Sequence, residues 1–193
     1  MGNLQSVQKA FEHLGAPVKL VTTASEIAAA DKLVLPGVGA FRDAMHHLDE
    51  QGVTAALREF AESGRPLLGV CLGLQLLFEA SEEAPGVSGL GLFPGTVRRF
   101  EPAADLKVPH MGWNSLQVNP SSRVLAGLGG DPFVYFVHSY YVEAAEAPAV
   151  AATTTYGVSF VSAVERGNVA GLQFHPEKSQ KTGLKILTNF VRL

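Results

Sequence analysis

A chain of 193 residues and 20.4 kDa has the size of a single domain that can bury a core without disulfides or metals. Hydrophobic residues make up 47% of the chain and charged residues 17%, which excludes a disordered protein and favours a layered fold with covered strands. The net charge is −3 and the basic residues are scattered, so neither nucleic acid nor a membrane is expected as a partner. A single cysteine, Cys71, and an N-terminus without a signal-peptide pattern predict a reducing, cytoplasmic environment.

The first half of the chain alternates predicted helices with predicted strands. Apolar residues at three- and four-residue spacing predict helices over 4–14, 25–30, 41–63 (broken at Gly52) and 72–79. Short apolar runs predict strands over 18–22, 32–35 and 67–70. This alternation is typical of parallel βαβ units.

The second half changes character and predicts strands with little helix between them. These strands span 97–100, 113–118, 134–142, 149–155, 159–165 and 169–174. Gly167-Asn168 is typical of a hairpin turn, and a last helix is predicted over 181–191. We therefore expect an α/β fold with a mostly parallel central sheet flanked by helices and additional antiparallel strands in the C-terminal half.

The strongest chemical signal is the segment Gly69-Val70-Cys71-Leu72-Gly73, where a predicted buried strand turns into a helix. The pattern is that of a nucleophile elbow with cysteine in place of serine, because a tight turn needs small flanking residues and exposes the residue at its tip. At a helix N-terminus the helix dipole favours a thiolate over a thiol. The alternative is an inert buried cysteine, and the glycine frame favours a catalytic Cys71.

His175-Pro176-Glu177 supplies a candidate base and its orienting acid. Pro176 favours an extended His175, and residues two apart in an extended chain share a face, so Glu177 is expected to bind one imidazole nitrogen. An ordinary turn with an ion pair is the alternative for this tripeptide. The pair His46-His47 and His13 are expected on solvated helix surfaces, and no metal site is predicted.

Gly37-Val38-Gly39 follows a predicted strand, at the edge where parallel sheets carry their functional loops. Two glycines allow backbone N–H groups to approach a ligand closely. We interpret the N–H groups of Val38 and Leu72 as an oxyanion hole, with a plain turn after the strand as the alternative.

At this point the sequence resembles the class I glutamine amidotransferase family, and within it the glutaminase subunits of imidazole glycerol phosphate synthases. The resemblance covers nearly the whole chain. It rests on the segments Pro36-Gly37-Val38-Gly39, Gly69 to Gln75, Ser81 to Gly86, Pro109 to Asn114, Tyr135 to Tyr140, and His175 to Ser179.

The resemblance implies a Cys71–His175–Glu177 triad that hydrolyses glutamine through a thioester, without a cofactor. It also implies a glutamine pocket formed by Gly37, Gly39, Gln75, Glu83, His138, Ser139 and Tyr140. The ammonia would pass to a cyclase subunit with a (β/α)₈ barrel for histidine biosynthesis, in a heterodimer. The residues implied at the partner interface are Pro109, Met111, Trp113 and Lys178.

Two alternatives remain for function: the glutaminase subunit of another ammonia-using synthase, and a glutamine-sensing module without turnover. One departure concerns the domain, which we expect to span 1–193. The family's usual apolar first strand is missing before the first helix, so its neighbours in the sheet are expected to lack a partner.

Overall fold

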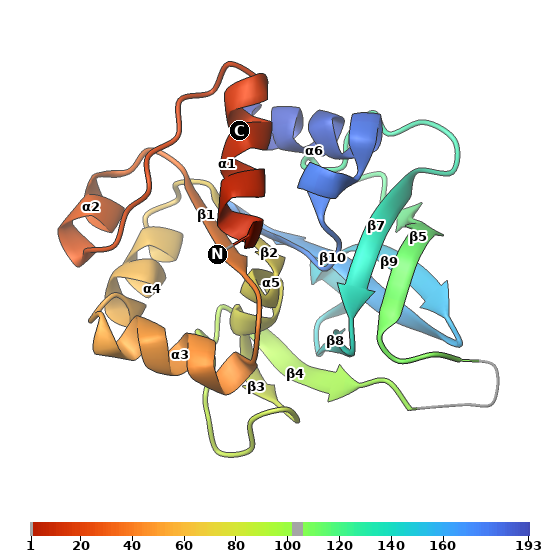
Figure 1. Cartoon of the computed structure of the whole chain (residues 1–193), viewed down its shortest axis with the longest axis horizontal. Coiled ribbons are helices and arrows are strands. Elements are labelled where there is room, and N and C mark those ends of the chain that lie inside the picture. Colours follow the sequence, from red (N-terminus) through yellow and green to blue (C-terminus); the bar gives the residue numbers. More distant parts are fainter. Residues whose placement is uncertain (1, 102–105) are drawn as a thin grey trace.

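The computed structural model describes residues 2–101 and 106–193 and forms a mixed sheet covered by helices (Figure 1). The α-helices are α1 (Gly2–His13), α2 (Ala24–Ala29), α3 (Phe41–Glu50), α4 (Thr54–Glu62), α5 (Leu72–Leu76) and α6 (Gln180–Arg192). Two 3₁₀ turns are η1 (Ala147–Ala149) and η2 (Pro176–Lys178). Among the described residues, no helix is long and apolar enough to cross a bilayer.

The strands form one nine-stranded sheet and one two-stranded sheet. They are β1 (Leu33–Gly37), β2 (Leu67–Cys71), β3 (Phe78–Ser81), β4 (Phe93–Arg99), β5 (His110–Ser115), β6 (Gln117–Val118), β7 (Phe133–His138), β8 (Tyr140–Ala144), β9 (Val150–Tyr156), β10 (Val158–Arg166) and β11 (Val169–Leu172). The main path runs β1-β2-β11-β10-β8-β4-β3, with β9 between β10 and β6, and β5 pairs with β7 alone. Parallel pairs join β1, β2 and β11, and antiparallel pairs dominate the second half, which confirms the predicted division.

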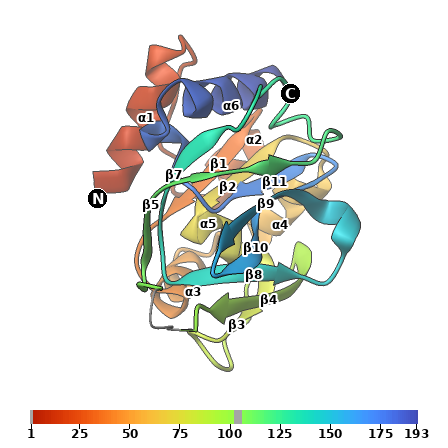
Figure 2. The same cartoon turned by 90° about the vertical axis from the view of Figure 1, so that its right-hand side faces the viewer.

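Two apolar clusters cover opposite faces of the sheet. One gathers buried side chains from α2, α3, α4 and α5, and the other gathers those from α1, α6 and β7. Figure 2 shows α1 and α6 together on one side of the strands. Strand β2 lies between the layers, since Leu67 belongs to the first cluster and Leu68 and Val70 to the second. A strand buried on both faces can fix the residue at its end, which is Cys71.

Most predicted elements are confirmed, but two predictions in the first half are wrong. Residues 18–22 form no strand. The helix predicted over 72–79 ends at Leu76, because the next residues form β3, where Phe78 pairs with Phe93. The long predicted strand 134–142 is two strands, β7 and β8, which belong to different sheets.

The outer edge of β1 has no strand beside it among the described residues. A cavity of about 810 Å³ lies there, lined by apolar side chains that include Val7, Phe11, Val21, Leu35 and Phe190. Residues 18–22 line the same cavity, so they have no neighbouring strand to pair with. This explains why their apolar pattern does not produce a strand.

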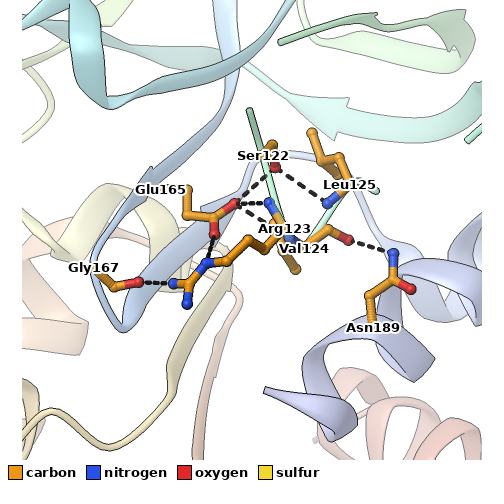
Figure 3. A network of polar contacts seen from close by, with 7 residues as sticks. All are labelled: Ser122, Arg123, Val124, Leu125, Glu165, Gly167 and Asn189. Atoms are coloured by element: carbon orange, nitrogen blue, oxygen red, sulfur yellow. Dashed lines mark hydrogen bonds and ion pairs between the residues drawn. The ribbon is translucent and has the colours of Figure 1, made fainter. Parts of the chain in front are cut away.

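A carboxylate network fixes the loop that leads into β7 (Figure 3). Glu165 on β10 accepts hydrogen bonds from Ser122 Oγ at 2.7 Å and from the backbone N–H groups of Arg123 and Val124 at 3.0 and 3.2 Å. Asn189 of α6 donates to the Val124 carbonyl at 3.1 Å. The loop is thereby tied to both the sheet and the C-terminal helix, which holds β7 in place.

Candidate active site

Cys71 lies at a sharp turn between β2 and α5. Its backbone has φ 56° and ψ −111°, a conformation that residues other than glycine rarely adopt. The elbow is tight, because a Cβ on Gly69 would lie 2.7 Å from the Gly73 carbonyl oxygen, and one on Gly73 would collide with the Leu35 carbonyl. The predicted role of the two glycines is therefore a steric one. Cys71 remains 8% exposed at the start of the helix.

His175 and Glu177 form a buried pair. His175 Nδ1 lies 2.8 Å from Glu177 Oε1, and the two side chains are 2% and 0% exposed. The predicted extended chain is wrong beyond His175, because Pro176 begins the turn η2. That turn still brings the carboxylate back to the imidazole. A carboxylate on Nδ1 leaves Nε2 as the nitrogen available to other groups.

Cys71 lies close to His175. Nε2 of His175 is buried and makes no regular hydrogen bond to any described residue. Burial lowers the pKa of His175, but Cys71 and Glu177 outweigh burial and raise that pKa to about 9. The imidazole is therefore protonated at neutral pH and faces the sulfur, an arrangement suited to a thiolate–imidazolium pair.

The glycine loop after β1 lies directly beside the elbow. The β1–β2 register pairs Gly37 with Cys71, and a Cβ on Gly37 would lie 2.9 Å from Leu72 Cβ. Gly39 has φ +97°, which favours glycine there. Val38 between them is 55% exposed. The structure thus brings together the two segments that were predicted to supply oxyanion N–H groups.

The predicted pocket residues are grouped around this elbow. Glu83 accepts a hydrogen bond from the Phe41 N–H at 2.8 Å, at the N-terminus of the helix that follows the glycine loop. Gln75 on α5 is buried, and its Nε2 lies 3.2 Å from the carbonyl oxygen of Tyr140. His138 ends β7, and burial lowers its pKa, with a smaller contribution from the charge of His175. Ser139 connects His138 to Tyr140.

The residues predicted at a partner interface share one surface. Met111 and Trp113 on β5 are 62% and 45% exposed, and Pro109, just before β5, is also exposed. Lys178 of η2 places its Nζ 5.6 Å from the Tyr135 ring centre, and the Trp113 ring lies 6.1 Å from the same ring. Exposed apolar and cationic side chains therefore meet beside the His175 turn.

Sequence reasoning missed three residues that support the triad. The Tyr135 carbonyl accepts a hydrogen bond from the His175 N–H at 2.9 Å. Ser179 Oγ donates to the His175 carbonyl at 2.6 Å and accepts from the Tyr135 N–H at 3.0 Å. Any Cβ on Gly183 would collide with the Pro176 carbonyl, so α6 packs directly on the turn η2. Tyr135 and Ser179 both lie in segments that carried the resemblance, but nothing in their spacing predicted this contact.

Among the residues that the structure describes, no three His, Cys, Asp or Glu side chains are grouped so as to hold a metal ion. The fold and the site define an α/β protein with a cysteine at a strand-to-helix elbow and a histidine–glutamate pair beside it. Residues 1–193 match the model of the family described as Glutamine amidotransferase class-I, and the chain belongs to that family.

Relatives point to one branch of that family. The "Imidazole glycerol phosphate synthase subunit HisH" of Moorella thermoacetica is 52% identical over 193 residues, which are 100% of this chain and 91% of the relative. The protein of the same name from Deinococcus radiodurans is 49% identical over 99% of this chain and 89% of its own. "Imidazole glycerol phosphate synthase hisHF, chloroplastic" of Arabidopsis thaliana is 48% identical over 98% of this chain, which matches 32% of that longer protein.

Solved structures agree with the fold. A crystal structure of a glutamine amidotransferase has a TM-score of 0.77 at 22% identity and covers 99% of this chain and 93% of its own. The structure of PurLQS from Thermotoga maritima has a TM-score of 0.76 at 18% identity, over 97% of this chain and 91% of the other.

Proposed function

We propose that the chain is the glutaminase subunit of an imidazole glycerol phosphate synthase, which hydrolyses glutamine and delivers the ammonia to a cyclase subunit in histidine biosynthesis. Full-length relatives near 50% identity that carry this name support the assignment. The observation that carries the chemistry is the strained Cys71 elbow beside the buried His175–Glu177 pair.

In the proposed reaction the Cys71 thiolate attacks the side-chain amide carbon of glutamine. The proton of His175 Nε2 passes to the amide nitrogen, the C–N bond breaks, and ammonia leaves a γ-glutamyl thioester. His175 then takes a proton from water, which attacks the thioester and releases glutamate and the free thiolate. Glu177 holds His175 by Nδ1 in the tautomer that this exchange requires.

Backbone groups would stabilise the tetrahedral intermediate. The N–H groups of Val38 and Leu72 are the proposed donors, because the glycine loop pairs with the elbow and the first N–H groups of α5 have no partner within the helix. One such donor is worth about 3 kcal/mol of barrier. Gly37, Gly39, Gln75 and Glu83 would line the glutamine site from the same side of the sheet.

The cyclase partner is proposed to be a (β/α)₈ barrel that binds the surface of Pro109, Met111, Trp113 and Lys178. Exposed aromatic side chains and methionine are enriched at interfaces between proteins, and Trp113 and Met111 are of this kind. Ammonia must reach the cyclase without meeting solvent, because a protonated ammonium ion is no nucleophile. His138, Ser139 and Tyr140, where β7 leads into β8, would complete the glutamine pocket next to this surface. The free thiolate and the pathway favour the reducing cytoplasm.

Glutamate release tests the proposal. The chain is co-purified with the cyclase, and hydrolysis of glutamine is measured with and without the phosphoribosyl-type acceptor substrate. We expect turnover that the acceptor stimulates and that the wild-type chain alone shows only weakly. A wild-type complex that binds glutamine but makes no glutamate would establish a sensing module. Activation by another synthase instead would establish the second alternative.

We also propose that residues 1–193 act as one glutaminase domain in which β1 is an edge strand among the described residues. The open outer edge of β1 and the apolar cavity beside it support this. Amide hydrogen exchange tests it, because the N–H groups of β1 that point away from β2 have no ladder partner. We expect them to exchange faster than the amides of β2. Equal protection in both strands would contradict the proposal.

A further inference from the structure

Two histidines far apart in the sequence face each other in the small sheet. The register of β5 and β7 places His110 directly opposite His138, and His110 Nδ1 lies 3.0 Å from His138 Nε2. The exposed fractions of the two residues are 3% and 6%. The chemical steps proposed above involve neither His110 nor this contact.

The hydrogen bonds of the pair allow one arrangement of protons. Burial lowers the pKa of His110 to about 4 and that of His138 to about 3, so both rings are neutral near pH 7. His138 Nδ1 lies 2.7 Å from the Tyr140 carbonyl oxygen, which can only accept, so Nδ1 carries the hydrogen and Nε2 accepts. His110 must therefore donate from Nδ1. Its Nε2 is left to accept from Asn114 Nδ2 at 3.3 Å.

The chain of contacts continues to the nucleophile helix. The Tyr140 carbonyl that accepts from His138 also accepts from Gln75 Nε2 at 3.2 Å. Gln75 lies on α5, the five-residue helix that begins directly after Cys71. Its Nε2 also lies 3.2 Å from Gln173 Oε1, on the segment that leads into His175. Buried hydrogen bonds thus connect β5 to the elements that carry both reacting groups.

The other end of the chain lies at the surface. His110 is the first residue of β5, and Met111 and Trp113 of the same strand are the exposed residues that we assign to the cyclase interface. A strand has few ways to move when one face is bound and the other is held by a buried imidazole. A partner that binds β5 would therefore restrict the position of His138 through its hydrogen bond with His110.

We propose that His110 is a positioning residue, which holds His138 and the Tyr140 carbonyl in the arrangement that fixes α5 and Cys71 when the cyclase is bound. The inference rests on the proposed function, because the cyclase-stimulated hydrolysis of glutamine is the reaction that His110 supports. The hydrogen bonds of His110 join it to His138 and Asn114, and in this proposal it acts only through the hydrogen bond that it donates to His138.

Two substitutions separate this hydrogen bond from simple packing. The His110 ring stacks on Tyr156 and Phe136, with ring centres 4.0 and 4.7 Å away. His110→Phe keeps the stacked ring and removes the donor. His110→Asn loses the ring and keeps an N–H donor near the position of Nδ1. A packing role predicts that His110→Phe is the better enzyme, and the positioning role predicts the reverse.

The test measures kcat and KM for glutamine in the co-purified cyclase complex with saturating acceptor substrate. We expect His110→Phe to lower kcat on the order of tenfold, since small displacements of reacting groups cost this much, and His110→Asn to retain more activity. Equal or higher kcat in His110→Phe, with an active wild-type complex, overturns the inference and leaves the proposed function standing. An inactive wild-type complex overturns the proposed function.

A spectroscopic measurement covers the case in which a variant does not fold. Nitrogen-15 spectra of the wild-type histidines report which ring nitrogen carries the hydrogen. We expect both His110 and His138 as neutral Nδ1–H tautomers near pH 7. An Nε2–H tautomer at His138 overturns the inference, because His110 then has no acceptor for its hydrogen bond.

Discussion

Gly69→Ala tests the idea that close contact between β2 and α5 sets the position of the nucleophile. A Cβ at Gly69 would lie 2.7 Å from the Gly73 carbonyl oxygen and 2.9 Å from the Leu74 nitrogen, both of them backbone atoms. Ordinary contact begins at 3.4 Å, so the first turn of α5 must move by about 0.7 Å. Overpacking of this kind costs about 1–3 kcal/mol. Alanine also lowers the conformational entropy of the unfolded chain relative to glycine, which offsets about 0.4–1 kcal/mol of this cost.

The net loss of stability is therefore about 0–2.6 kcal/mol, and its midpoint of about 1.3 kcal/mol corresponds to roughly 3–5 °C in Tm for a chain of this size. Activity should fall further, by on the order of tenfold, because the displaced turn carries Cys71. Thermal unfolding and glutamate release in the cyclase complex measure the two effects. Gly129→Ala is the matched control, since a Cβ there meets no atom within 4 Å. A Gly69→Ala variant with wild-type Tm and kcat would refute the steric account of the elbow.

Three further substitutions test the site. Cys71→Ala should abolish glutamate release and leave assembly with the cyclase intact on size-exclusion chromatography, and turnover above background would exclude Cys71 as the nucleophile. Glu177→Gln should bring the pKa of His175 down from about 9, because burial then opposes only Cys71. The stabilisation by protonated His175 is complete below its ordinary pKa of 6.5 and is lost as the pH rises through about 9. The fall in Tm with rising pH should therefore occur at lower pH in the variant than in the wild type. A variant with the wild-type dependence of Tm on pH would contradict this. Trp113→Ala should weaken cyclase binding by about 30-fold, as expected for an aromatic hot spot, whereas Leu20→Ala, at a residue 58% exposed in the loop beside α2, should leave calorimetric affinity unchanged.

Local sequence patterns predicted those elements that local physics decides. The first helix ends at His13, close to its predicted boundary, and Gly15 with φ +74° follows it; Gly167 forms the predicted hairpin between β10 and β11. The strand predicted over residues 18–22 does not form, because a strand needs a neighbour to pair with and a cavity lies where that neighbour would be, beside β1. The predicted end of α5 is wrong for the opposite reason. Phe78 pairs with Phe93 in the sheet, and helix periodicity contains no information about this pairing.

The candidate site divides along the same line. The elbow at Cys71 and the His175–Glu177 pair lie within five and three residues, so local spacing was enough to predict that these side chains are neighbours, although the turn at Pro176 was not foreseen. Contacts of Glu83 with the start of α3, and of His110 with His138, join residues 42 and 28 positions apart. Such contacts depend on sheet register and helix packing, which no local pattern determines.

Strand β7 shows how one element serves both halves of the proposed mechanism. Its side chains alternate, with Val134, Phe136 and His138 buried and Tyr135 facing Trp113 and Lys178. The buried face reaches Gln75 through the His138 ring and the Tyr140 carbonyl, and the Tyr135 backbone carbonyl at the edge of the strand accepts a hydrogen bond from the His175 N–H. Nucleophile helix and base are therefore held by the same strand. A partner that shifts β7 against the main sheet moves both groups together, whereas a change confined to His110 acts only through His138, the Tyr140 carbonyl and Gln75. One support thus depends on side chains and the other on a backbone carbonyl, so a substitution at His110 leaves the hydrogen bond between the His175 N–H and the Tyr135 carbonyl in place.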